Sequence, residues 1–451
     1  MLDIQFIRDN AELVKQKSAL KGYKVQIDEL LELDGQRRTR LTQIDELRAR
    51  RNQQASELKQ GRPSEEQIAT GRQLKEELTS LESDLSKIDA DYQRLLKAVP
   101  NMPLDDVPAG ASEDDNVVSK QVGEKTEFNF QPKSHWELAE AKDLIDKERA
   151  TKVAGPRFAY IKGDLVLLQM AIMQFVIKTL SDVSLLQKLI DENNLQIVAK
   201  PFVPILPPAM IKTPVYDAMD RLEPREERYK VGSEEDDLWL QGSAEHTLGS
   251  MYADEILLEN DLPIRYVGYL TSFRREAGTY GKDTEGIIRM HQFDKLEMEV
   301  FSTPETGLAE HQLLCAIQEY LVQQLGLPYQ ILQKCTADIG KPNACGIDLE
   351  TWMPGQGKYR ETHTADYMTD YQSRRLKTRF RRQPKSAHAI TSIADVAASG
   401  SPAVGLVHTN DATAFALGRI MVAIIENYQT AEGNIGIPDI LQPFMGGKTQ
   451  I

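Results

Sequence analysis

Apolar residues recur at a helical spacing through the N-terminal part of the chain. In one stretch they are separated by alternating steps of four and three: Leu74, Leu78, Leu81, Leu85, Ile88, Tyr92 and Leu95. This is the a/d seam of a heptad pattern, and it predicts a long helix that packs against one other helix. A thinner stripe precedes it: Leu30, Leu33, Leu41, Ile44, Leu47 and Leu58. The two stripes predict two long helices within about residues 27–98.

A turn signal separates the two stripes. Gly61-Arg62-Pro63 stops the first helix, and Ser64 can cap the second, with Glu65 and Glu66 in its first turn. We therefore predict an antiparallel helical hairpin with an exposed tip.

The pattern changes beyond Pro100-Asn101-Met102-Pro103, where a loop rich in Pro, Gly, Asp and Glu runs to about Glu127. We place a domain boundary near residue 110. Short β-rich runs then alternate with helical segments, without strict β-α-β alternation, which favours an antiparallel α+β sheet over a doubly wound one. The predicted helices are Leu165–Leu180, Thr303–Leu325 and Ala414–Tyr428, and the predicted strands are Ile197–Val203, Leu238–Gln241, Tyr269–Phe273, Ile287–Phe293 and Leu349–Met353.

Charge is distributed unevenly along this chain. The formal net charge is −14, which argues against a surface coated with cations for non-specific nucleic-acid binding. The stretch from Gln36 to Arg62 nevertheless carries Arg37, Arg38, Arg40, Arg48, Arg50, Arg51, Lys59 and Arg62, against only Asp45, Glu46 and Glu57. On its pattern alone the hairpin is equally a structural spacer or a dimerisation coiled coil. The concentration of arginine favours an arm that contacts a phosphate backbone.

Composition restricts the class of protein. Hydrophobic residues make up 41% of the 451 residues and charged residues 27%, as in soluble globular proteins of two or three domains. No apolar run reaches the roughly 18 to 20 residues that a membrane span needs, and the start lacks signal-peptide features. The three cysteines, Cys315, Cys335 and Cys345, form neither a disulfide framework nor a zinc pattern. We expect a cytoplasmic protein without membrane contact.

The strongest chemical signal is a hairpin-like pattern between Phe273 and Phe293. Arg274 and Glu276 end one β-like run, a loop containing Gly278, Gly281 and Gly286 follows, and Arg289 and Phe293 lie on the second run. Arginine binds phosphate oxygens, a carboxylate accepts from an adenine amine, and an aromatic ring stacks on the base. The alternative is a surface hairpin with cross-strand salt bridges.

The whole segment from Phe273 to Glu297 resembles motif 2 of the class II aminoacyl-tRNA synthetases, in the form found in seryl enzymes. The resemblance extends to the first ten residues, the helical arm, the Pro100–Pro103 junction and Pro443-Phe444-Met445 near the end. It implies a six- to seven-stranded antiparallel catalytic sheet flanked by helices, a homodimer, and an arm that grips the long variable arm of tRNA(Ser). Use of tRNA(Sec) stays open. Residues 1–110 would then form the tRNA-binding domain and residues 111–451 the catalytic domain.

The same resemblance implies roles for single residues around ATP. Arg274 would hold the α-phosphate and the serine carboxylate, Glu276 would read the adenine amine, and Arg419 would clamp the γ-phosphate. Arg274 and Arg419 are the implied catalytic pair. The remaining ATP set is Arg275, Arg289, Met290, Phe293, Glu361, Thr362, His363 and Thr364, of which Glu361 and Thr364 would also bind Mg²⁺.

The implied serine pocket consists of Ser243-Ala244-Glu245, Arg274, Glu297 and Thr413. Thr413 lies in a segment resembling motif 3, Asn410–Arg419, where it replaces a serine and alanines replace the usual glycines. Pro201, within Leu195–Leu206, is the candidate proline of motif 1 at a dimer interface. The stretch Ser386–Gly405 is longer than its usual counterpart, and we assign it no role.

We therefore expect an enzyme that activates L-serine with ATP and transfers it to the 3′ end of tRNA. Two alternatives remain: a paralogue that loads an amino acid on a carrier protein, and a non-catalytic tRNA-binding scaffold. The basic arm argues against the first alternative. The presence of Arg274, Glu276, Glu297 and Arg419 argues against the second.

Overall fold

The computed structural model describes residues 1–57, 64–233, 235–276, 286–383 and 404–451. The predicted turn at Gly61–Pro63, the residues Leu58 and Lys59, the loop glycines Gly278 and Gly281, and nearly all of Ser386–Gly405 lie outside these ranges. The chain divides into two compact units, Met1–Met102 and Pro103–Ile451. Each unit is described by itself.

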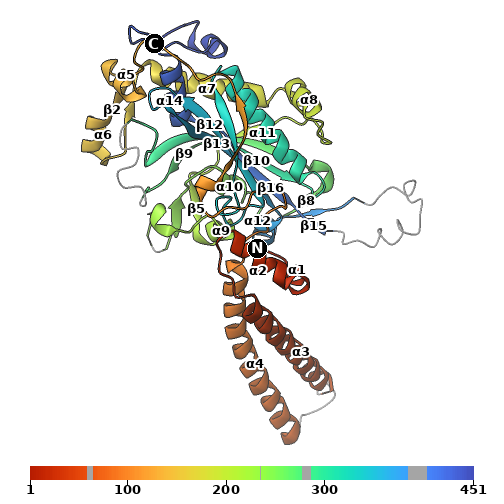
Figure 1. The fold of residues 1–451 in the computed structure, drawn as a ribbon. Coiled ribbons are helices and arrows are strands. Elements are labelled where there is room, and N and C mark those ends of the chain that lie inside the picture. The colour runs from red at the N-terminus through yellow and green to blue at the C-terminus, as the bar shows by residue number, and fades with distance from the viewer. Residues whose placement is uncertain (58–63, 234, 277–285, 384–403) are drawn as a thin grey trace. The chain divides into compact units, whose positions relative to one another are not determined.

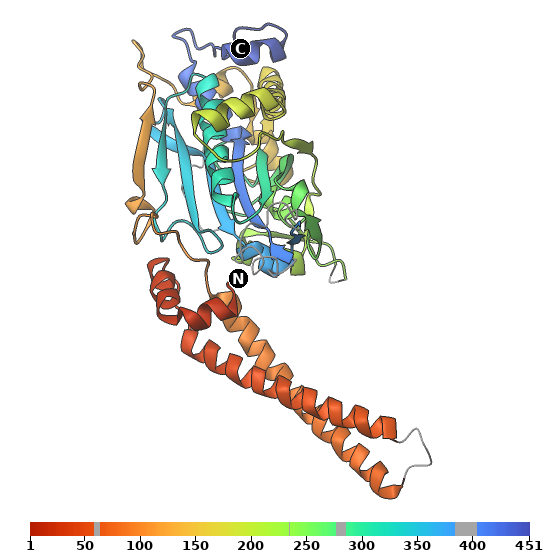
Figure 2. The same ribbon diagram turned by 90° about the vertical axis from the view of Figure 1, so that its right-hand side faces the viewer.

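The first unit is helical, and it confirms the predicted hairpin. Its helices are α1 (Ile4–Asp9), α2 (Ala11–Leu20), α3 (Ile27–Glu57) and α4 (Glu65–Ala98). α3 and α4 lie side by side in both views (Figures 1 and 2). The predicted seam is their contact surface: Ile44, Leu47 and Leu78 are buried there, with Leu74, Leu81 and Leu85 packed around them.

Ser64 begins α4 as predicted. Its Oγ accepts a hydrogen bond from the backbone N–H of Gln67 at 3.2 Å, and the Gln67 side chain accepts from the Ser64 N–H at 2.9 Å. This capping box satisfies two backbone donors that the first helical turn leaves without partners.

The second unit is built on an eight-stranded sheet in the order β1-β11-β12-β13-β16-β10-β9-β4. Its central strands β12, β13, β16, β10 and β9 are labelled in Figure 1. Its strands are β1 (Val117–Val122), β4 (Val203–Ile205), β9 (Ile264–Phe273), β10 (Gln292–Ser302), β11 (Tyr329–Gln333), β12 (Cys345–Met353), β13 (Lys358–Thr369) and β16 (His408–Ala416). All neighbours are antiparallel except β4 and β9. The antiparallel α+β class is confirmed. The strand number exceeds the six to seven that the resemblance implied, because β1 and β4 pair at the two edges.

Helices and smaller sheets surround this sheet. The helices are α5 (His135–Ala141), α6 (Lys147–Ala154), α7 (Asp164–Leu180), α8 (Val183–Glu192), α9 (Thr213–Ala218), α10 (Glu245–Leu248), α11 (Gly307–Gln324), α12 (Tyr371–Leu376) and α14 (Leu417–Asn427), with 3-10 turns η2 (Glu113–Asp115), η3 (Arg225–Glu227), η4 (Glu259–Asp261) and η6 (Asp439–Met445). The smaller sheets join β5 (Met210–Lys212), β7 (Leu238–Leu240) and β6 (Tyr229–Val231); β15 (Val404–Leu406), β14 (Arg379–Arg381) and β8 (Ile256–Leu258); and β2 (Ile145–Asp146) and β3 (Tyr160–Ile161).

The pleat of β10 separates the core from the polar chemistry of the unit. Successive side chains of a strand point to opposite faces of the sheet. Leu296, Met298 and Val300 belong to the main core, together with residues of α7, α11 and α14. Lys295, Glu297 and Glu299 alternate with them and therefore lie on the opposite face, which we call the polar face.

Most elements expected from the sequence are present, with three shifts at their ends. Leu165–Leu180 and Thr303–Leu325 correspond to α7 and α11. Ala414–Ala416 was predicted to begin a helix but completes β16, because pairing with β10 outweighs the helix propensity of alanine. Of Ile287–Phe293 only the last two residues are in a strand. Similarly, Ile197–Val203 contributes only Val203 to β4.

No single helix in the described ranges is long and apolar enough to cross a membrane. The pair α7 and α8, bent by 71°, passes that test by length and composition only.

Candidate active site

A cavity of about 110 Å³ opens on the polar face and collects residues from three distant parts of the chain. We call it the central cavity. Its lining residues are Arg274, Glu276, Ile287, Ile288, Arg289, Met290, Phe293, Lys295, Glu361, Thr362, Thr364, Thr413, Ala416, Gly418 and Arg419. Most of the residues predicted to bind ATP therefore line one cavity, although Ile287 and Ile288 were expected in a strand. Their apolar side chains face the cavity from a turn.

Arg274 follows the last residue of β9. Its Nε donates a hydrogen bond to the carbonyl of Gly242 at 3.0 Å, and its guanidinium lies 5.3 Å from the centre of the Phe293 ring. A cation above a ring face is held by electrostatic attraction. Contacts within the chain thereby orient the side chain at the cavity.

Glu276 and Arg289 form an ion pair across the predicted motif 2 hairpin, with Arg289 Nη1 2.6 Å from the Glu276 carboxylate. The salt bridge proposed by the alternative interpretation thus exists. It is not a surface pair, because both side chains are mostly buried and both line the central cavity.

Arg419 lies in the first turn of α14 and reaches β13. Its Nη1 donates to the Glu361 carboxylate at 2.7 Å and to the Glu361 carbonyl at 3.1 Å. Thr364 accepts a hydrogen bond from Lys334 Nζ at 3.0 Å, and Asp348 is its partner in the register of β12 and β13. Burial raises the pKa of Asp348 to about 7, against the attraction of Lys334. Carboxylates and a hydroxyl therefore gather at this end of the cavity.

A second group of side chains lies next to the central cavity, and we call it the inner cluster: Ser243, Glu245, Lys295 and Glu297. The Nζ of Lys295 is 3.0 Å from Ser243 Oγ and 3.7 Å from the Glu245 carboxylate, and it forms an ion pair with Glu297. Ser243 Oγ in turn donates to Glu245. All four side chains are nearly inaccessible to solvent.

Burial affects the two carboxylates of the inner cluster differently. It raises the pKa of Glu297 well above its ordinary value, in opposition to Lys295. Burial also acts to raise the pKa of Glu245, but Lys295, His246 and Arg221 attract its charge and the net pKa is lowered. The pKa values of the two neighbouring carboxylates are therefore shifted in opposite directions, with that of Glu245 lowered and that of Glu297 raised.

Thr413 completes this region from β16. It is buried and is the register partner of Glu297, so its side chain shares the polar face with that carboxylate. Asp411 is two residues earlier on the same strand, and Arg221 Nη2 lies 3.2 Å from its carboxylate. Burial raises the pKa of Asp411 to about 7, and the nearby Glu245 adds to this rise.

Sequence reasoning missed Lys295, Arg221 and Asp411. Period-two spacing could have indicated two of them, because Lys295 lies between Phe293 and Glu297 and Asp411 two residues before Thr413. Nothing in the local sequence marks Arg221. Its neighbour Asp220 has a left-handed backbone, with φ of 58°, and pairs through its carboxylate with Arg375 and Lys341.

Three of the predicted site residues lie apart from these two groups. His363 does not line the central cavity, and its ring packs 5.1 Å from that of Phe415, so its position does not support contact with ATP. Ala244 is buried in an apolar cluster beside the cavity. Arg275 is exposed, with its guanidinium 5.2 Å from the centre of the Tyr229 ring.

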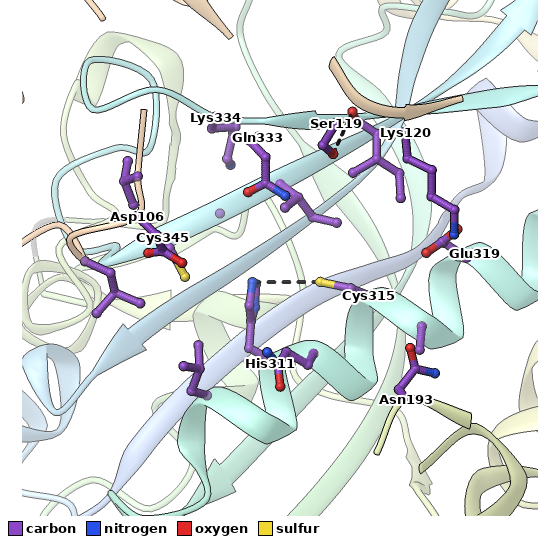
Figure 3. Close-up of a pocket in the computed structure, with 18 of the residues that line it drawn as sticks. Asp106, Ser119, Lys120, Asn193, His311, Cys315, Glu319, Gln333, Lys334 and Cys345 are labelled. Atoms are coloured by element: carbon purple, nitrogen blue, oxygen red, sulfur yellow. Dashed lines mark hydrogen bonds and ion pairs between the residues drawn. The ribbon is translucent and has the colours of Figure 1, made fainter. Parts of the chain in front are cut away.

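A larger cavity, of about 490 Å³, lies between α11 and the strands β1, β11 and β12 (Figure 3). Cys315, Cys345 and His311 face it, with His311 Nε2 3.8 Å from Cys315 Sγ. Burial raises the pKa of Cys345 to about 12 and that of Cys315 further, so neither thiol is activated as a nucleophile. None of the predicted site residues that the structure describes lines this cavity.

The six arginines predicted to bind tRNA all lie on α3 but differ in availability. Arg37 is half-buried, bound to Asp89 at 2.5 Å and packed over Tyr92. Arg40 is half-buried and donates to Gln43, while Arg48 pairs with Glu82 at 2.8 Å. Arg38 is exposed and 3.8 Å from Asp34. Arg50 and Arg51 are exposed and make no ion pair with any residue in the described ranges.

Comparison with known proteins covers the whole chain. Residues 229–428 match the family model of the tRNA synthetase class II core domain (G, H, P, S and T), and residues 1–103 match that of the seryl-tRNA synthetase N-terminal domain. The chain is 36% identical to a serine–tRNA ligase of Exiguobacterium sp. over 100% of its length and 99% of the relative's. It is 38% identical to that of Dehalococcoides mccartyi, with 99% of each chain covered.

Comparison with solved structures shows the same similarity. A seryl-tRNA synthetase from Pyrococcus horikoshii complexed with ATP superimposes with a TM-score of 0.83 at 35% identity, covering 100% of this chain and 99% of that one. The chain belongs to the seryl-tRNA synthetase family, the class II ligases that activate serine and charge tRNA(Ser).

Proposed function

We propose that the central cavity holds ATP and that the inner cluster, with Thr413, holds serine, so that the two substrates react where Arg274 and Lys295 meet them. The observation that supports this is the adjacency of two different sites. One is lined by arginines and an aromatic ring, and the other by buried oxygens suited to an ammonium and a hydroxyl. The relative from Pyrococcus horikoshii is complexed with ATP.

The proposed role of each residue in binding ATP follows from the chemistry of its side chain. Phe293 and Met290 would contact the adenine ring, and Glu276 would accept from its amine after exchanging Arg289 for the base. Arg289 and Arg419 would bind the γ-phosphate, and Arg274 the α-phosphate and the serine carboxylate. Two of these arginines are paired with carboxylates at 2.6 and 2.7 Å in the structure. Binding of ATP therefore replaces internal ion pairs by ion pairs with phosphate.

The reaction needs no protein nucleophile. A serine carboxylate oxygen attacks the α-phosphorus, the new O–P bond forms, and pyrophosphate leaves with the electron pair of the broken P–O bond. In the second step the 3′-terminal ribose hydroxyl of tRNA attacks the carbonyl carbon, the bond between that carbon and the phosphate oxygen breaks, and AMP leaves with the electron pair and accepts the hydroxyl proton. The chain contributes position and fixed positive charge where negative charge develops.

Selectivity for serine would come from the buried oxygens of Glu297 and Thr413. A site that hydrogen-bonds a substrate hydroxyl rejects an analogue lacking it by about 10⁴- to 10⁵-fold, because its own polar atoms are then left without partners. Alanine, which lacks only this hydroxyl, should bind poorly for this reason.

Glu361 and Thr364 would hold Mg²⁺ at the phosphate end of the cavity, since carboxylate and hydroxyl oxygens suit a hard cation. Among the described residues, no group of three or more His, Cys, Asp or Glu side chains is arranged to hold a metal ion. Phosphate oxygens of ATP would therefore complete its coordination. When bound there, the ion would neutralise phosphate charge.

We propose a homodimer that forms through α7 and the edge strand β4. Leu167 and Met170 on α7 are 46% and 53% exposed, and Val203 on β4 and the nearby Leu206 are 53% and 79% exposed. β4 pairs with β9 on one side only, so its other edge is available to a second strand. Sedimentation should show a dimer for the wild type and a monomer for Met170→Glu; a dimeric M170E variant would contradict this interface.

The proposal also concerns the tRNA that accepts the activated serine. The first unit would bind tRNA(Ser) through the exposed arginines of α3, and the second unit would carry catalysis. Charging of tRNA(Ser) and tRNA(Sec) transcripts under identical conditions decides whether the second tRNA is also a substrate.

ATP–pyrophosphate exchange with each of the twenty amino acids, without tRNA, tests the proposal. We expect exchange with serine alone. Exchange with a different amino acid would refute the assignment of the inner cluster. No exchange would favour the scaffold alternative, and exchange without any charging of tRNA would favour the carrier-protein alternative.

A further inference from the structure

The ammonium of Lys295 occupies the middle of the inner cluster. It lies 3.0 Å from Ser243 Oγ, contacts Glu297 and is 3.7 Å from Glu245. The residue is only 6% exposed. These oxygens are the ones that the proposed function gives to serine, so a lysine ammonium now stands where the ammonium of the substrate is expected.

Two ammonium groups cannot share this cluster without cost. Like charges a few ångströms apart repel, and the repulsion is stronger in a buried site than in water. The cluster offers two carboxylates and one hydroxyl, and Lys295 already contacts all three. When the ammonium of serine binds to these oxygens, it displaces the ammonium of Lys295 from them.

The ammonium of Lys295 can move to a second position. Its side chain also lines the central cavity, together with Arg274 and Thr413. Lysine carries three donors on a flexible four-carbon stem, so the ammonium can exchange partners while the backbone of β10 stays fixed. The direction available to it is toward the boundary between the two sites, where the serine carboxylate would meet the α-phosphate.

We propose that Lys295 is a catalytic residue that exchanges partners during serine activation: it neutralises the inner cluster in the free enzyme and, displaced by the serine ammonium, binds the serine carboxylate and an α-phosphate oxygen. This inference rests on the proposed function. Lys295 transfers no proton. The carboxylate oxygen forms the bond to phosphorus, pyrophosphate takes the electron pair of the broken bond, and the lysine offsets the charge that accumulates on the phosphoryl oxygens.

A purely structural Lys295 predicts something different. If the lysine only held Glu245 and Glu297 together, removing it would lower stability and change the KM for serine. The kcat at saturating serine would stay the same. A catalytic role instead lowers kcat, because the contact with the phosphoryl oxygens is stronger in the transition state, where more negative charge accumulates on them.

The experiment is ATP–pyrophosphate exchange with the wild type, Lys295→Met, Lys295→Gln and Lys295→Arg, each with melting temperature measured. Lys21→Met is the matched control, because Lys21 is an equally buried lysine of the first unit, 4% exposed. The Gln variant can still hydrogen-bond Ser243 and Glu297, so it tests the proposal even if the Met variant does not fold.

We expect kcat to fall at least 100-fold in the Met and Gln variants, with the KM for ATP changed less than threefold. The Arg variant should recover at least tenfold over Met, because it restores a positive charge. Serine should still raise the melting temperature of the Gln variant. Lys21→Met should exchange at the wild-type rate.

A kcat within threefold of wild type in the Gln variant would overturn the role of Lys295 and leave the proposed function intact. Equal losses in the Gln and Arg variants would also overturn it, because charge would then not be the operative property. Failure of the wild type to exchange with serine would overturn the proposed function and this inference together.

Discussion

The two units of this chain use arginine in opposite ways. On α3 of the first unit, Arg50 and Arg51 are exposed and make no ion pair within the described ranges, and Arg48 is half-exposed and pairs with Glu82 at the surface. In the second unit Arg265 is completely buried. Its Nε and Nη2 bind Glu310 at 2.8 Å, and it donates to the carbonyls of Lys200 and Val198.

An exposed arginine is suited to binding a partner, whereas a buried arginine is suited to holding other groups in a fixed position. An exposed arginine keeps its hydration and conformational freedom until a partner arrives, so its contribution is made on binding and is weakened by salt. A buried arginine that donates four hydrogen bonds, as Arg265 does, is fixed in advance. Arg274 and Arg419 lie between these extremes, because internal contacts hold them while a cavity leaves them accessible.

The largest expected effect comes from breaking a fully buried pair. Arg265→Met leaves the Glu310 carboxylate uncompensated between β9 and α11, and we expect the free energy of unfolding to fall by about 3–5 kcal/mol. Urea unfolding followed by circular dichroism measures it. The double variant Arg265→Met/Glu310→Leu should recover most of the loss; an equally large loss in both would mean that packing, not the unpaired charge, dominates.

Arg274→Ala comes next. We expect adenylate formation to fall by about 10²- to 10³-fold, by analogy with removal of one fixed donor to transition-state charge, while the melting temperature changes little. Pyrophosphate exchange measures the rate. The control is Arg225→Ala, an exposed arginine that pairs with Glu223 at 2.9 Å. Turnover of the Arg274 variant at the wild-type rate would refute its assignment.

On the arm, Arg48, Arg50 and Arg51 are changed together to Gln. We expect the KM for tRNA to rise about tenfold and the slope of log K against log salt to become shallower by about 2, since each lost phosphate contact removes about 0.7 to 0.9. Pyrophosphate exchange without tRNA should not change. Arg72→Gln/Arg94→Gln, on the exposed surface of α4, is the matched control. Equal losses in charging and exchange would instead make the α3 arginines structural.

The smallest effect is on the pH dependence of stability. Burial raises the pKa of Asp411 to about 7 from an ordinary 3.8, so the folded protein binds more protons than the unfolded chain between these values. Stability should therefore decrease as pH rises through this window. Asp411→Asn removes this titration, and the difference in unfolding free energy between about pH 5 and about pH 8 should shrink. An unchanged difference would show that Asp411 is charged throughout.

Sequence alone predicted the two units unequally. The helical arm could be predicted from periodicity, because a heptad pattern indicates which residues of the two helices contact each other. Ser64 indicated where α4 begins. The central cavity required the family resemblance, since Glu361 and Arg419 are 58 residues apart and meet only through the sheet. Lys295 and Arg221 escaped both approaches. Lys295 contacts Ser243 and Glu245, and Arg221 pairs with Asp411, so both roles depend on partners that are distant in the sequence and leave no local signature.

The alternation along β10 has a genetic consequence. Substitutions there can be explored one at a time, because each side chain belongs either to the core or to the polar face. A single inserted or deleted codon between Phe293 and Glu299 would retain nearly every side chain. The side chains beyond it would nevertheless point to the opposite face of the sheet, so that lysine and glutamate would enter the core and leucine and methionine would face the substrates. In variant libraries of this strand a point change should therefore disturb one face only, whereas any change of length should abolish both the core packing and the site.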